Sequence, residues 1–332
     1  MLHPDGDISS ADVLIEGNRI AAIGPDLRAP LADGVDVFGA TLVPGYIDLH
    51  VHGGGGSSLI STRRKEIESY SRWVASHGVT GFLATICADS LEAAILTAGV
   101  SSKVGAVDDG AAVLGLNFEG PFVSPERPGA LPHSWLQAPS LEMLQQVLDA
   151  APGNVRVMTI APELEGAAEV IAAAIEAGVV VAVGHTDAEY DVAAEAFKSG
   201  AAHVTHAFNA MRPLHHREPG PLGAALDSPG VTIEVIADGV HLHRATVNLL
   251  VKAFGPDRVC LVTDAVTPAG LVSGVFKLGG VEAKLDRGSI RLPDGTIAGS
   301  AATMDLVVRN VVTWGVATLP EAVTMASVVP AR

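Results

Sequence analysis

Apolar and polar positions follow two different patterns, one up to residue 43 and one after it. In the first part, short apolar runs at residues 13–15 and 20–23 flank a glycine-containing turn, which is typical of two antiparallel strands. Residues 35–37 and 41–43 continue the β pattern. We therefore expect a small β-sandwich-like domain over residues 1–43, too small to be stable alone.

From residue 44 onward, short apolar strands alternate with amphipathic stretches, the pattern of βαβ units around a parallel sheet. The stretches at residues 65–77, 164–177 and 188–199 each end at or next to a glycine, a residue that often closes a helix. Eight such units predict an α/β fold, a (β/α)8 barrel over residues 44–332. The strands are expected to end near His50 and His52, Cys87, Glu119, Ala161, His185, His206, Asp238 and Asp264.

Five of these eight strand ends carry side chains that can bind a metal ion or transfer a proton. In a (β/α)8 barrel the carboxyl ends of the strands form the floor of the active site. Chance would rarely place four imidazoles and two carboxylates there. The candidate site residues are His50, His52, Glu119, His185, His206 and Asp264.

Spacing supports a ligand role for the first histidine pair. His50 and His52 are two residues apart, so both side chains of a strand at these positions face the barrel axis. Their apolar flanks argue against the alternative, two surface histidines on an edge strand.

Glu119 closes an apolar strand, where a carboxylate is costly without a partner or a metal. The alternative to a metal-binding role for Glu119 is a structural salt bridge. If Glu119 does bind metal, its position between two imidazole pairs would allow its carboxylate to bridge two cations.

The remaining candidates complete a catalytic metal site. His203 and His206 are three residues apart and face opposite ways in a strand, so we take His206, at the strand end, as the ligand. His203 is assigned to the core or to the layer behind the site. Imidazole and carboxylate ligands suit zinc, which is the ion we expect, and also iron, cobalt or manganese, with one or two ions per chain. Asp264 would accept the proton of a water in the open coordination position.

Composition narrows the classes of partner. The formal net charge of −16, from 21 basic and 37 acidic residues, argues against binding to nucleic acid or to anionic membranes. Asp5 and Asp7 fall where a signal peptide would be apolar, and no apolar run is long enough to span a bilayer. We therefore expect a cytoplasmic protein. Cys87 and Cys260 lie in apolar runs and are predicted to be small buried hydrophobic residues.

Several phrases of the sequence together resemble a known family. Within the amidohydrolase superfamily, PGYIDLHVHGGGG, NFEGPF, GHTDAEYD, THAFNAM, REPG, ADGVH and LVTDA look like the N-acetylglucosamine-6-phosphate deacetylases. The resemblance runs from about residue 13 to residue 332. The HxH pair alone would indicate only the superfamily, whereas EGPF, THxxNAM and REPG narrow it to the deacetylases.

The resemblance implies roles for individual residues. Glu119, His185 and His206 would bind the principal metal, and Asp264 would be the general base and acid. His50 and His52, which some family members lack, would bind a second metal bridged by Glu119. For the substrate, the resemblance implies Asn209 and Ala210 at the sugar, Arg217 and His241 at the phosphate, and Ile297, Ala298 and Gly299 in a loop that closes on the ligand.

Two stretches depart from the family. Members usually carry a substrate-contacting histidine in a Gly-x-His stretch after EGPF, whereas this chain has Gly129, Ala130 and Leu131, with His133 two residues further on. Ala130 and His133 are kept as candidate substrate contacts. Relatives also have an extra strand at the beginning and further strands at the end, so we expect unpaired edges in the small domain.

The expected reaction is hydrolysis of the acetamide of N-acetyl-D-glucosamine 6-phosphate, in amino sugar catabolism and cell-wall recycling, by a homodimer. A cationic cluster would attract the anionic substrate to this acidic protein, unless its members merely line a polar loop. The alternatives are an N-acetylgalactosamine-6-phosphate deacetylase, a cyclic amidase, or an inactive metal-binding barrel that serves as an assembly partner. The members of the cluster are Arg212, His215, His216, Arg217 and His241.

Overall fold

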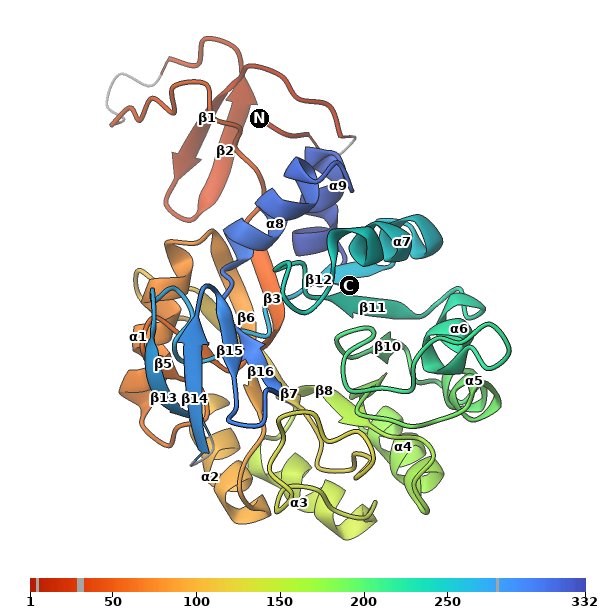
Figure 1. Ribbon diagram of the computed structural model, residues 1–332. Helices are drawn as coiled ribbons and strands as arrows, with labels where there is room; N and C mark the ends of the chain where they lie inside the picture. The colour runs from red at the N-terminus through yellow and green to blue at the C-terminus, as the bar shows by residue number, and fades with distance from the viewer. Residues whose placement is uncertain (4–5, 29–32, 279–280) are drawn as a thin grey trace.

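The computed structural model describes residues 1–3, 6–28, 33–278 and 281–332. Its centre is a parallel sheet in which each of eight strands pairs with the next one along the barrel sequence. A parallel bridge between Val51 and Ala265 brings the first strand to the last, so the sheet closes and the predicted (β/α)8 barrel is confirmed (Figure 1). The strands are β3 (Tyr46–Val51), β6 (Val79–Ile86), β7 (Ala112–Phe118), β8 (Val155–Ile160), β9 (Val180–Val183), β10 (His203–Val204), β11 (Thr232–Val235) and β12 (Val259–Leu261).

Helices surround the barrel and pack apolar residues against it. In α1, for example, Ile67, Tyr70 and Val74 recur at helical spacing and are buried. The three predicted amphipathic stretches form α1, α4 and α5, and the glycines that follow them have positive φ. Among the described residues, none of the helices combines the length and apolar character needed to cross a membrane. They are α1 (Arg64–Ala75), α2 (Leu91–Ser101), α3 (Leu141–Ala150), α4 (Ala167–Glu176), α5 (Tyr190–Lys198), α6 (Gly220–Leu226), α7 (Arg244–Phe254), α8 (Met304–Thr313), α9 (Leu319–Val323) and the π-helical turn η1 (Thr324–Val328).

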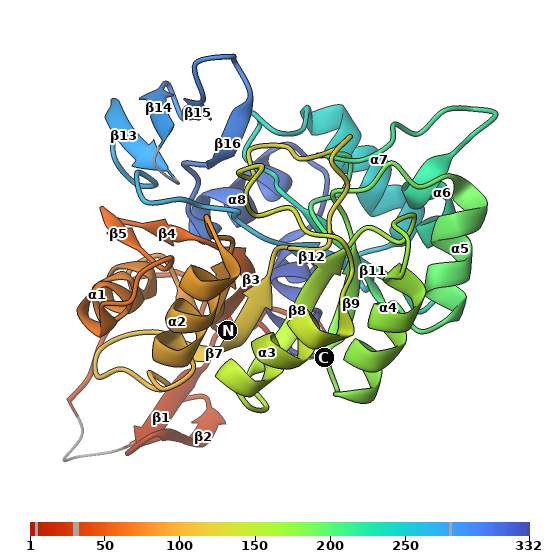
Figure 2. The same cartoon turned by 90° about the horizontal axis from the view of Figure 1, so that it is seen from below.

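The amino-terminal residues form a hairpin of β1 (Asp12–Glu16) and β2 (Arg19–Gly24), as predicted, which projects from the barrel (Figures 1 and 2). Residues 35–37 and 41–43 are both described, and neither segment forms a strand, so this prediction was wrong. Val35 is 86% exposed, and an isolated extended segment has no neighbouring strand to satisfy its backbone. Residues 4–5 and 29–32 of the predicted β domain lie outside the described residues.

A four-stranded antiparallel sheet lies between β12 and α8 in the sequence and is not among the predicted elements. Figure 2 shows it beside β4 (Gly53–Gly54) and β5 (Ser57–Ser58). Ile297, Ala298 and Gly299, predicted to lie in a loop, belong to its last strand, because residues 289–291 provide a partner strand. The strands are β13 (Gly274–Leu278), β14 (Val281–Asp286), β15 (Ser289–Arg291) and β16 (Ile297–Ser300).

Two close backbone approaches join these parts to the carboxyl end of the barrel. The Ser300 amide donates a hydrogen bond to the Asp264 carbonyl oxygen at 2.7 Å, which anchors β16 beside the end of β12. After β3, the chain passes over the indole of Trp73: a Cβ atom at Gly54 would lie 2.2 Å from that ring. Only glycine fits at this approach, so Trp73 and Gly54 together fix the direction of the chain that leaves β3.

Candidate metal centre

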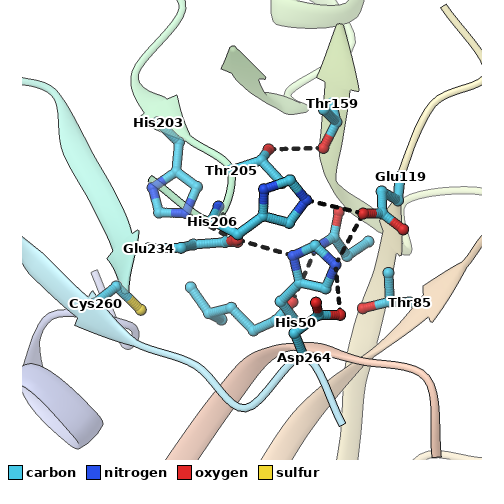
Figure 3. A network of polar contacts seen from close by, with 12 residues as sticks. His50, Thr85, Glu119, Thr159, His203, Thr205, His206, Glu234, Cys260 and Asp264 are labelled. Atoms are coloured by element: carbon cyan, nitrogen blue, oxygen red, sulfur yellow. Dashed lines mark hydrogen bonds and ion pairs between the residues drawn. The ribbon is translucent and has the colours of Figure 1, made fainter. Parts of the chain in front are cut away.

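Six polar side chains converge at the carboxyl ends of the barrel strands. Figure 3 labels His50, Glu119, His206 and Asp264 among them. They come from five strand ends: His50 lies near the end of β3, His52 just after it, and the others follow β7, β9, β10 and β12. Each is at most 8% exposed, so a cluster of four imidazoles and two carboxylates is enclosed by the protein. The structure therefore brings together all six residues that the strand-end pattern singles out: His50, His52, Glu119, His185, His206 and Asp264.

Glu119 occupies the middle of the cluster, between two histidine pairs. Its Oε1 lies 2.9 Å from His185 Nε2 and 3.1 Å from His206 Nε2. On the other side, His52 Nε2 is 3.3 Å from Oε2, and His50 Nε2 is 3.5 Å from Oε1. All four imidazoles thus direct the same ring nitrogen at one carboxylate.

Asp264 lies on the side of the second histidine pair. Its Oδ1 is 3.4 Å from His52 Nε2 and 3.7 Å from His50 Nε2. Burial disfavours its charged form, but the hydrogen bond with His52 and the charge of His50 outweigh burial and lower the pKa of Asp264. Burial also disfavours the charged form of Glu119, but the hydrogen bonds with His185 and His206 outweigh burial and hold the pKa of Glu119 well below its usual range.

The donor set fits divalent cations. The potential ligand atoms of Glu119, His185 and His206 all lie within 4.8 Å of one another, as do those of His50, His52 and Asp264. His50 Nε2 is buried and has no hydrogen-bond partner, and His185 Nε2 and His206 Nε2 face each other at 3.0 Å. Buried nitrogens normally find partners, and cations between these groups would supply them. Nitrogen and oxygen ligands suit zinc, iron, cobalt and manganese.

The imidazoles are held from behind in the orientation that ligation requires. His185 Nδ1–H donates to the Arg127 carbonyl oxygen at 3.0 Å, and His50 Nδ1–H donates to the Glu234 carboxylate at 2.8 Å. With the proton held on Nδ1, the Nε2 atom of each ring, which is directed at Glu119, would be free to bind a metal ion. Such outer hydrogen bonds commonly accompany metal-binding histidines.

Backbone strain accumulates at the same positions. His185, His206 and Asp264 have φ values of 46°, 24° and 49°, in the left-handed region that residues other than glycine rarely adopt. Each such conformation costs about 1–3 kcal/mol and persists where the surrounding structure enforces it, most often at functional sites. Here it turns three strand-end residues sharply beside Glu119.

The model of the amidohydrolase family matches residues 41–332. The chain belongs to the amidohydrolase family. It is 32% identical over 330 residues to N-acetylglucosamine-6-phosphate deacetylase of Lysinibacillus sphaericus, which covers 98% of this chain and 85% of the relative. It is 35% identical over 335 residues to N-acetylgalactosamine-6-phosphate deacetylase of Escherichia coli O157:H7, with coverages of 100% and 87%.

Solved structures of this family agree with the fold. A variant of N-acetyl-D-glucosamine-6-phosphate deacetylase from Mycobacterium smegmatis, in complex with N-acetyl-D-glucosamine-6-phosphate, matches this chain with a TM-score of 0.88 at 37% identity. The match covers 96% of this chain and 84% of that one. The family and the fold thus agree with the resemblance carried by the sequence motifs.

Some candidate substrate residues of this amidohydrolase lie directly beside the metal cluster. Asn209 and Ala210 follow His206, and Asn209 Nδ2 donates to the His206 carbonyl oxygen at 3.2 Å. A Cβ atom at Gly129 would lie 3.1 Å from His185 Cε1 and 3.3 Å from Ala210 Cβ. The loop that carries the exposed residue Ala130 therefore packs against the rim of the cluster.

The other candidate substrate residues differ in how far their side chains are exposed to solvent. Arg217 is exposed, and its Nη1 donates to His216 Nε2 at 2.8 Å. The His241 side chain is only 6% exposed, and its Nδ1–H donates to Asp238 Oδ2 at 2.7 Å. Burial lowers the pKa of His241, but the bond to Asp238 outweighs it and raises the pKa above its usual value. His133 is exposed, in the segment between EGPF and α3.

Two residues beside the cluster are not among the predicted site residues. Glu234 is a fully buried carboxylate in the apolar strand β11, the same signal that singled out Glu119. Cys87 is half-buried, and its Sγ lies 3.7 Å from His52 Nδ1, so the prediction that it is a buried hydrophobic residue was wrong. It directly follows β6 and so lies at the same end of the barrel as the cluster. Cys260 is buried, as predicted.

The two triads predict separable metal sites. Replacing His50 and His52 together by alanine should remove one metal ion per chain and leave the other, since Glu119, His185 and His206 remain. Metal content of the purified protein, measured by plasma mass spectrometry, checks this. His77→Ala, which removes an imidazole paired with Asp305 instead, is the control. A double variant with the metal content of the wild type would show that the first histidine pair binds no ion.

Proposed function

We propose that this chain hydrolyses the acetamide of N-acetyl-D-glucosamine 6-phosphate to D-glucosamine 6-phosphate and acetate. The observation that carries the proposal is the buried carboxylate of Glu119 between two histidine pairs, with Asp264 beside one of them. The relatives support the substrate, because curated proteins named for this deacetylation match the chain over most of their length. One structural match contains N-acetyl-D-glucosamine-6-phosphate itself.

The residues of the cluster divide the chemistry between them. Glu119, His185 and His206 would hold the principal divalent ion, and His50 and His52 the second, with Glu119 shared. Such an ion polarises a carbonyl group and lowers the pKa of water. Asp264 accepts the proton of the attacking water, since its lowered pKa keeps it ionised. It then passes the proton to the nitrogen of the amide, so that the amine leaves as a neutral group.

The surrounding loops would orient the sugar phosphate. Asn209 and Ala210 are placed beside His206 and are proposed to hold the sugar. Arg217 and His241 are proposed to hold the phosphate, because a guanidinium and an imidazolium form charge-assisted hydrogen bonds with it. Further contacts are proposed for two segments that border the site, with residues Ala130 and His133 in one and Ile297, Ala298 and Gly299 in the other.

The proposal extends to the identity of the metal ion, the oligomeric state, the location and the metabolic role of the protein. Zinc is proposed as the ion because the ligands are imidazoles and carboxylates. We also propose a homodimer, a cytoplasmic location, a role in amino sugar catabolism and cell-wall recycling, and a division of the chain into a small β domain (1–43) and the barrel (44–332). Native mass spectrometry of the metal-loaded protein measures the oligomeric state and the number of ions together.

N-Acetylgalactosamine 6-phosphate is the second candidate substrate. It is favoured by the 35% identity to an N-acetylgalactosamine-6-phosphate deacetylase along the whole of this chain. The two sugars differ only in the configuration at one hydroxyl group, so the same metal centre serves both. Acetate release from each sugar phosphate at equal concentration decides between them; ring opening of a cyclic amide without acetate release would contradict both.

Asp264→Asn should bind metal and substrate but turn over about 100-fold more slowly or worse, the usual scale for losing a general acid or base. The amide side chain keeps the size of the carboxylate but cannot accept the proton. Acetate release under saturating substrate measures the effect. Asp257→Asn, at a position whose side chain is 74% exposed, is the matched control. Turnover of Asp264→Asn close to that of the control would mean that another group moves the proton.

Arg217→Ala should reduce kcat/KM for the 6-phosphorylated sugar about tenfold or more, equivalent to about 1.4 kcal/mol. Its effect on the unphosphorylated sugar should be much smaller, because the guanidinium contacts only the phosphate. His241→Ala should act in the same direction. Arg309→Ala, an exposed arginine in α8, is the control. Equal losses on both sugars would show that Arg217 shapes its loop and does not bind the phosphate.

A further inference from the structure

Glu234 forms a hydrogen-bonded junction behind the metal cluster (Figure 3). It lies in β11, and its side chain is fully buried. Its Oε2 accepts the Nδ1–H of His50 at 2.8 Å and the backbone N–H of His206 at 2.9 Å. Its Oε1 accepts from His203 Nε2 at 3.2 Å. One carboxylate thus contacts a proposed ligand of each metal site.

The junction is extended on its far side. His203 Nδ1 lies 2.6 Å from Thr232 Oγ1, so a chain of hydrogen bonds runs from Thr232 through His203 and Glu234 to His50. Three N–H donors converge on the Glu234 carboxylate, an arrangement that suits its ionised form. An ionised, fully bonded carboxylate cannot rotate without breaking several hydrogen bonds.

The two rings of the first histidine pair are supported unequally. His50 is backed by the Glu234 carboxylate at 2.8 Å, whereas the backing contact of His52 is the Cys87 sulfur at 3.7 Å. A carboxylate behind an imidazole fixes the ring and raises its basicity as a ligand, whereas a thiol does so weakly. On the other side, the bond to the His206 amide holds that residue at its unusual φ of 24°.

We propose that Glu234 is a positioning residue that sets the affinity of the second metal site and ties it to the backbone of the first. It contacts no substrate and acts through His50 and, more weakly, through His206. The proposal rests on the metal-binding part of the proposed function. It assigns to Glu234 the largest contribution, among residues that do not bind the ion, to the site formed by His50 and His52 with Glu119 shared.

Glu234→Gln tests the proposal because it removes the charge and keeps the shape. The amide oxygen can still accept from His50 and His206, while the amide nitrogen faces His203. Zn²⁺ is titrated calorimetrically into the full-length, chelator-treated protein, and Co²⁺ is titrated in parallel with its visible absorption recorded. We expect the dissociation constant of the second equivalent to rise about 10–100-fold. The first equivalent should change by a smaller factor, and the Co²⁺ spectrum of the second site should change in shape.

Thr159→Val is the matched control, since it breaks a buried hydrogen bond to Thr205 in the same barrel without touching a proposed ligand side chain. If the role of Glu234 were only structural, both variants would lower thermal stability and neither would change metal affinity. Thr232→Val removes the hydrogen bond between Thr232 and His203 at the far end of the hydrogen-bond chain. It should raise the dissociation constant of the second metal ion less than Glu234→Gln does. This milder variant also keeps the test decisive if Glu234→Gln does not fold.

The outcomes separate the two proposals. A wild-type protein that binds no divalent ion would overturn the metal-dependent function, and the role of Glu234 with it. A wild type that binds two ions, together with Glu234→Gln and Thr232→Val proteins whose second dissociation constants match that of Thr159→Val, would overturn the role of Glu234 alone. A selective rise in the second constant supports both.

Discussion

The structure of this site depends on one buried charge, the carboxylate of Glu119. A carboxylate removed from water is strongly disfavoured unless nearby groups compensate it. Here four ring nitrogens approach it within 3.5 Å, and they come from three strand ends of the barrel, those of β3, β9 and β10. The left-handed backbone at His185 and His206, and the outer hydrogen bonds that hold the rings, follow from that requirement.

The barrel supplies the rigid frame on which these groups meet. At its seam, the fully buried Asp48 carboxylate accepts the Thr263 hydroxyl at 2.5 Å and two backbone N–H groups, one of them that of His50. Burial raises the pKa of Asp48 to about 7 despite these hydrogen bonds. Polar contacts therefore join β3, which carries His50, to the segment after β12, which carries Thr263 and Asp264.

Much of this arrangement was predictable because its signals are local. The two-residue spacing of His50 and His52 fixes a common face, and strand ends in a βα repeat share one end of the barrel. The strands of residues 274–300 show hairpin signals, alternation in β14 and a glycine turn before β15, but those signals do not show where the sheet docks. The sheet is attached by the hydrogen bond from the Ser300 amide to the Asp264 carbonyl oxygen. These two residues lie in different parts of the structure, so the spacing of residues in the sequence does not predict this contact. Glu234 does carry a local signal, a carboxylate in an apolar strand, but that signal does not identify its partners His50 and His206, which come from two other strand ends.

The central claim is that Glu119 is shared by two divalent ions, one on each side. Diffraction from crystals of the zinc-loaded protein, with anomalous data collected at the zinc edge, tests it most directly. We expect two anomalous peaks about 3.5–4 Å apart, as in other two-metal sites. One should lie among Glu119, His185 and His206, the other among Glu119, His50 and His52. A single peak, or a pair in which only one ion contacts Glu119, would contradict the claim.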